Sequence, residues 1–80
     1  MNSDRVLAKL NKVFQDVFDD DRIEVTSQTT ARDIDGWNSL ANIRLMIAVE
    51  EEFQIKFDVG EFQEYRRVGD LIAGVARRTS

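Results

Sequence analysis

The chain has no cysteine and no histidine among its 80 residues. Without a thiolate, an imidazole base or the usual zinc ligands, most nucleophilic, acid–base and metal chemistry cannot be assembled from its side chains. No disulfide braces the fold either, which is compatible with the cytosol, and we expect a cytoplasmic protein. The composition therefore predicts a protein that is not an enzyme, with no catalytic residues and no metal site.

Long apolar runs are missing as well. Residues 1–21 are polar and charged from the start, unlike a secretory signal or a membrane span. Acidic residues outnumber basic ones by 15 to 11, and the resulting net charge of −4 would be repelled by a phosphate backbone. We expect no membrane insertion and no nucleic-acid partner. The lack of a basic recognition helix also argues against a helix-turn-helix DNA binder.

Apolar residues recur at helical spacing near both ends of the chain. The first predicted helix spans residues 4–18, with Ser3 as its N-cap. The last begins at Val68 and closes on Arg77 and Arg78, whose positive charge suits the C-terminal end of a helix dipole. Both helices are amphipathic and need a core to cover their apolar faces.

A second long helix is predicted to follow the N-cap Asn38 and to run to about Phe53. Its wide apolar face consists of Leu40, Ile43, Leu45, Met46, Ile47, Val49 and Phe53. Asp58 can cap a short third helix, which carries apolar side chains of its own. These are Val59, Phe62 and Tyr65.

The longest connection, residues 19–38, joins the first two long helices and contains few side chains able to reach a core. Its aliphatic anchors are Ile23, Val25 and Ile34. We expect a short helical turn near residues 30–33, a turn rather than a calcium loop over residues 33–36, and packing for Trp37. No alternating strand pattern occurs, so residues 1–80 are predicted to form one all-α domain, a small four-helix bundle with three main helices and a short one.

Ser39 opens the second predicted helix directly after Asn38. Its hydroxyl lies where backbone N–H groups are unpaired and the helix dipole is positive, which would favour an attached phosphate. Taken alone, a serine at this position is usually a capping or first-turn residue. A hydrolytic role is disfavoured, because there is no histidine base and no lysine lies in a recognisable serine–lysine motif.

Three segments resemble signatures of the acyl carrier protein family. The first is Asp-Gly-Trp-Asn-Ser-Leu at residues 35–40, similar to the family's Asp-Ser-Leu triplet at the start of an amphipathic helix. The second is Val-Glu-Glu-Glu-Phe at residues 49–53, similar to the Glu-Glu-x-Phe that ends that helix. The third is Val-Gly-Asp-Leu at residues 68–71, similar to the start of the family's last helix. The match covers essentially the whole chain.

The resemblance implies that Ser39 receives 4′-phosphopantetheine from coenzyme A, added by a phosphopantetheinyl transferase. The terminal thiol would then hold an acyl group as a thioester for acyl-loading, acyl-transferring and condensing enzymes. A carrier of this size needs no partner to fold, so we expect a monomer. The resemblance implies partner contacts at Asn38, Leu40, Arg44, Ile47, Glu50 and Glu51. For Met46, which matches a position of the same kind, core packing is the preferred interpretation.

Several positions depart from the family pattern. The family normally has Asp before the serine, where this chain has Asn38, so one negative charge that helps the transferase is lost while helix capping is retained. Ala41 and Arg44 stand where acids usually face basic partner surfaces. Arg67 stands where a capping Thr is common, which predicts a less sharply defined start for the last helix.

Two alternatives stay open on these residues. An aminoacyl carrier, of the D-alanyl or peptidyl kind, is the alternative within the family, although the Gly-Gly-His/Asp-Ser pattern common in such carriers is absent. Outside it, an unmodified helical adaptor could present the face from Leu40 to Ile47 to a partner helix. The nature of the acyl cargo is not set by the sequence.

Overall fold

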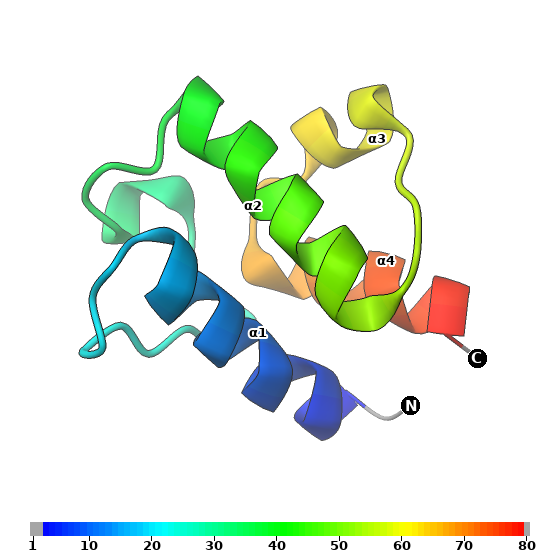
Figure 1. Cartoon of the computed structure of the whole chain (residues 1–80), viewed down its shortest axis with the longest axis horizontal. Helices are drawn as coiled ribbons and strands as arrows, with labels where there is room; N and C mark the ends of the chain where they lie inside the picture. Colours follow the sequence, from blue (N-terminus) through cyan, green and yellow to red (C-terminus); the bar gives the residue numbers. More distant parts are fainter. Residues whose placement is uncertain (1–2, 80) are drawn as a thin grey trace.

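The computed structural model describes residues 3–79 of the chain. Helices α1 (Ser3–Val17) and α2 (Ser39–Phe53) lie side by side and run in opposite directions, and α4 (Val68–Thr79) packs against α1 (Figure 1). The six-residue α3 (Val59–Glu64) precedes α4. Within the described residues there is no strand, only an isolated bridge between Thr30 and Arg67. The predicted helical bundle with three long helices and one short helix is confirmed.

The core lies between the three long helices and consists mainly of the apolar residues whose helical spacing predicted these helices. Phe57 and Phe62, around the start of α3, pack edge to face with their ring centroids 5.1 Å apart and extend this core toward α4. The most deeply buried large side chains are Val6, Leu10, Phe14, Leu45, Val49, Val68 and Val75. Burial of this apolar surface is the main force that holds the bundle together.

The bounds of the first predicted helix are corrected. Ser3 is the first residue of α1 rather than its cap. The helix ends at Val17, and two residues later Asp19 takes a left-handed φ of 51°. On α2, three residues of the predicted apolar face are exposed to solvent: Leu40, Ile43 and Ile47, at 63%, 43% and 47%. Their spacing places them on one stripe, on the side of the helix that α1 does not cover.

The long connection is tied to the bundle as predicted, by Ile23, Val25 and Ile34. Asn11 of α1 also fixes its path, because its side-chain oxygen accepts from the Val25 N–H at 2.6 Å and its amide donates to the Val25 carbonyl at 3.2 Å. The expected helical turn is the 3-10 helix η1 (Ala31–Asp33).

The start of α4 is well defined, which corrects the expectation drawn from Arg67. The Asp70 carboxylate accepts from the backbone N–H groups of Arg66 and Arg67 at 2.9 and 3.1 Å, and these bonds hold the pKa of Asp70 below its usual range. The next two N–H groups donate to loop carbonyls: Val68 to Thr29 and Gly69 to Ser27, each at 2.9 Å. Asp70 and the loop thus supply the capping that a Thr would otherwise give.

Gly74 of α4 packs directly against Tyr65. A Cβ at this position would lie 2.2 Å from the Tyr65 hydroxyl oxygen, whose proton is donated to Glu61 at 2.7 Å. We expect Gly74→Ala to lower the free energy of unfolding by about 1–2 kcal/mol, because overpacking outweighs the roughly 1 kcal/mol that alanine contributes to helix propensity. Denaturant unfolding measures this, and the loss should shrink in a Tyr65→Phe background. A more stable Gly74→Ala protein would contradict the packing.

Candidate functional site

The N-terminal end of α2 is built by a turn and a cap. Gly36 adopts a φ of +87°, a conformation that strains any other residue, and this turns the chain into the helix. Asn38 then caps α2 as predicted, because its side-chain oxygen accepts from the Ala41 N–H at 2.9 Å. The capping is complete without Ser39, so the serine side chain is not needed to begin the helix.

Ser39 is exposed on the first turn of α2, and its hydroxyl makes no hydrogen bond within residues 3–79. It borders a hollow of about 310 Å³. The hollow brings together residues from three separate segments. Besides Ser39 its lining consists of Ala31, Trp37, Asn38, Asn42, Tyr65 and Arg66.

Two of the polar groups in the wall of this hollow already have partners. The Trp37 indole N–H donates to the Asn42 side-chain oxygen at 3.1 Å, and the Tyr65 hydroxyl donates to Glu61. Burial, together with Glu61, raises the pKa of Tyr65 to about 12, so this phenol stays protonated at neutral pH. Arg66 differs, since its guanidinium pairs with no carboxylate in the part of the chain that the structure describes.

Trp37 links the site to the core. Its ring lies 5.2 Å from that of Phe14, edge to face, and 6.2 Å from that of Phe18, as centroid distances. The predicted packing role of this residue is confirmed. The wall of the hollow is therefore fixed by α1.

Beyond Ser39, the exposed stripe of Leu40, Ile43 and Ile47 runs along α2 with the exposed Arg44 beside it. These are four adjacent positions of an outward-facing surface that no other part of the described chain covers. Met46, in contrast, is 8% exposed and belongs to the core, which confirms the packing interpretation.

The acidic end of α2 is divided between two environments. Glu51 is exposed, whereas Glu50 is half-buried and accepts from the Phe57 N–H at 2.8 Å. The Glu50 carboxylate thus holds the segment that leads into α3, in addition to any contact it makes with a partner.

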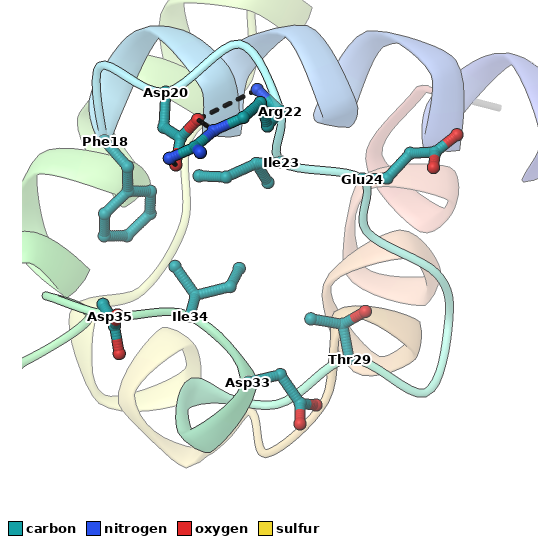
Figure 2. Close-up of a pocket in the computed structure, with 9 residues that line it drawn as sticks. All are labelled: Phe18, Asp20, Arg22, Ile23, Glu24, Thr29, Asp33, Ile34 and Asp35. Atoms are coloured by element: carbon teal, nitrogen blue, oxygen red, sulfur yellow. Dashed lines mark hydrogen bonds and ion pairs between the residues drawn. The ribbon is translucent and has the colours of Figure 1, made fainter.

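A larger hollow of about 520 Å³ lies elsewhere, between the end of α1 and the long loop. Phe18, Ile23 and Ile34 extend into it, and an Asp20–Arg22 pair stands at its edge (Figure 2). Charged and polar side chains complete its rim: Glu24, Thr29, Asp33 and Asp35. Ser39 is not part of its lining, so volume alone does not identify the site.

Two absences among residues 3–79 bear on other functions. No group of three or more His, Cys, Asp or Glu side chains in this range could hold a metal ion. No helix in this range is both long enough and apolar enough to cross a membrane.

Sequence reasoning missed four residues of the hollow: Ala31, Asn42, Tyr65 and Arg66. Tyr65 was expected only as an apolar residue of the third helix, and Arg66 was not singled out. Tyr65 and Arg66 are far from Ser39 along the chain and reach it only through the tertiary fold, in which Tyr65 packs against Gly74 of α4, and no local motif reports this. Chemically, the site offers an exposed, unengaged alcohol at a helix N-terminus beside an open hollow, which suits a phosphodiester on that oxygen.

Comparison with known proteins agrees with this chemistry. The family model described as the phosphopantetheine attachment site matches residues 8–75. The acyl carrier protein of Phenylobacterium zucineum is 32% identical over 73 residues, covering 91% of this chain and 92% of that protein. The acyl carrier protein of Caulobacter vibrioides is 29% identical over 75 residues, covering 94% and 96%.

A solved structure is similar as well. The solution NMR structure of the holo acyl carrier protein from Geobacter metallireducens has a TM-score of 0.83 at 43% sequence identity, and the match covers 90% of this chain and 83% of that one. Sequence and fold agree over nearly the whole length. The chain therefore belongs to the phosphopantetheine-attachment family, among the acyl carrier proteins.

Proposed function

We propose that Ser39 is the attachment point for the 4′-phosphopantetheine of this acyl carrier protein, and that residues 1–80 work as one carrier domain. The single observation that carries the proposal is the exposed Ser39 hydroxyl, which has no hydrogen-bond partner in residues 3–79 and lies beside a hollow at the start of α2. Once attached, the group supplies the thiol that holds an acyl unit as a thioester, which this cysteine-free chain cannot supply itself.

The other predicted site residues act on partner proteins in this proposal. Asn38 and Leu40 flank the serine and meet the phosphopantetheinyl transferase first. Arg44, Ile47 and Glu51 extend the contact surface toward the far end of α2, with Glu50 beside them. The apolar stripe offers contact area, and the charges give orientation. The partners are the transferase and the acyl-loading, acyl-transferring or condensing enzymes, which perform the chemistry, and the work is done in the cytoplasm.

Mass spectrometry tests the proposal. The purified chain is incubated with coenzyme A and a broad-specificity phosphopantetheinyl transferase, and its intact mass is measured. We expect a gain of one phosphopantetheine, located to Ser39 by peptide mapping. A chain that gains no mass would favour the unmodified adaptor, for which the exposed Leu40, Ile43 and Ile47 stripe is the supporting feature. A gain located to Ser27 would also contradict the proposal.

The cargo is tested separately. Protein purified from its native host and analysed without reducing agent should carry acyl groups as thioesters on the arm. Aminoacyl groups in their place would identify the alternative carrier type and would leave the proposed attachment point intact.

Asn38→Asp is expected to raise kcat/KM for loading by about two- to fivefold, since it adds a negative charge at the position where the transferase engages the family. Asp caps a helix about as well as Asn, so stability should not change. Initial loading rates measure the effect. Ala8→Glu, which adds the same charge at an exposed position of α1, is the control. Equal rates for Asn38→Asp and the unaltered chain would show that this charge is irrelevant here.

A further inference from the structure

The charges around Ser39 differ from those of the chain as a whole. The protein carries a net charge of −4, yet the first turn of α2 contains no acidic residue. Arg66 lines the same hollow as Ser39, and no carboxylate in residues 3–79 neutralises its guanidinium. Among the side chains that line this hollow, Arg66 is therefore the only one that carries a charge.

Asn38 adds a second donor at the same place. Its side-chain oxygen is occupied by the Ala41 N–H, whereas its amide nitrogen donates to no group within residues 3–79. An aspartate here would cap the helix equally well but would place a negative charge beside a phosphate. In this chain the Asn38 amide can donate a hydrogen bond to the phosphate, whereas an aspartate at this position would repel it.

Among the other polar residues of the lining, Trp37 and Tyr65 offer surface rather than further donors. The Trp37 indole N–H is taken by Asn42, and the Tyr65 hydroxyl by Glu61. What these two residues offer a bound group is mainly aromatic and apolar area, suited to an uncharged, flexible chain. The hollow thus has a cationic edge next to Ser39 and aromatic side chains in its wall.

We propose that Arg66, assisted by the Asn38 amide, holds the phosphate of the arm and positions the arm along the hollow on the surface of the carrier. This inference rests on Ser39 as the attachment point. Arg66 is a positioning residue in it, because a guanidinium donates to phosphate oxygens through a fixed fork of N–H groups. A seated arm would be partly withheld from solvent until a partner enzyme competes for it.

The composition of the chain allows the position of the arm to be measured directly. Trp37 is the only tryptophan, so the ¹⁵N-labelled chain has one indole N–H resonance, and it comes from the wall of the hollow. There is no cysteine, so a nitroxide thiol reagent labels only the arm of the loaded protein. Paramagnetic broadening of the indole resonance then reports how often the arm lies in the hollow.

The comparison uses the loaded full-length chain and three variants. We expect strong broadening in the unaltered protein, and in Arg66→Gln a fall of about two- to fivefold in the ratio of seated to free arm. Arg66→Lys should retain part of the effect. Arg44→Gln, which removes the same charge from an exposed α2 position outside the hollow, should retain all of it. Salt should reduce the broadening in the unaltered protein more than in Arg66→Gln.

The outcomes separate this proposal from the proposed function. Intact mass first shows whether each variant carries the arm, and unchanged amide spectra of the unloaded variants show that they are folded. A loaded Arg66→Gln protein broadened as strongly as the unaltered one would overturn the role of Arg66 while Ser39 stands. Equal loss in Arg66→Gln and Arg44→Gln would overturn it as well, because the effect would then be one of net charge. A chain that takes up no arm would overturn both proposals.

Discussion

Ser39→Ala is expected to abolish phosphopantetheine loading completely while changing the free energy of unfolding by no more than about 0.5 kcal/mol. The two effects separate because the side chain does different things in each process. In the proposed loading reaction, its oxygen would form the bond to phosphorus, and alanine has no atom to replace it. In folding, the hydroxyl makes no hydrogen bond within residues 3–79, and Asn38 caps the helix.

Intact mass and denaturant unfolding, measured on the same preparation, check this result. Ser27→Ala, at an exposed loop serine, is the matched control and should load like the unaltered chain. Residual loading of Ser39→Ala would mean that another hydroxyl accepts the arm. A destabilisation of several kcal/mol would mean that Ser39 has a structural role that the described contacts do not include.

Phe14→Ala is expected to lower the free energy of unfolding by about 3–5 kcal/mol. Phe14 is fully buried, and its ring contacts those of Phe18 and Trp37, with centroids 5.9 and 5.2 Å away. Removing the ring loses apolar burial and leaves a cavity where α1, the long loop and the site meet. A domain of this kind is stable by only about 5–15 kcal/mol in total, so the variant would be close to unfolding at physiological temperature.

Thermal and denaturant unfolding measure the loss, with Lys12→Ala, at an exposed position of the same helix, as the control. Because Trp37 packs on Phe14, loading should also slow in the variant under conditions where it is still folded. A change of less than about 1 kcal/mol in Phe14→Ala would contradict the central place of this ring cluster in the core.

The helices themselves could be predicted because their apolar residues repeat with the helical period. The side of α2 that is buried could not be predicted in this way. Leu45, Val49 and Phe53 form one apolar stripe and Leu40, Ile43 and Ile47 another, and both have helical spacing. Only the packing of α1 against one side of α2 decides which stripe enters the core, and that packing is a property of the whole fold.

The residues of the candidate site likewise could be predicted only in part. Ser39 and Asn38 were accessible from sequence, because a cap and a first-turn residue are local features and the surrounding segments resemble a family. Tyr65 and Arg66 were not, because a short helix and a turn far along the chain carry them to the serine. Glu50 was expected to face partners, but its bond to the Phe57 N–H depends on the path of the chain after α2.

Backbone hydrogen bonds join the long loop to the start of α4. Val68 and Gly69 bind the carbonyls of Thr29 and Ser27 through backbone atoms alone, and Gly69 leaves no room for a Cβ, which would lie 2.9 Å from the Ser27 oxygen. At Ser27 and Thr29 the loop is therefore held through carbonyls, which every residue type possesses, whereas the side chains of Thr26 and Gln28 accept hydrogen bonds from the Gln28 N–H at 3.2 Å and from Arg67 at 3.1 Å. The exposed Ser27 side chain makes no hydrogen bond within residues 3–79 and can be exchanged without loosening these bonds, which makes position 27 a place to engineer new specificity into this carrier.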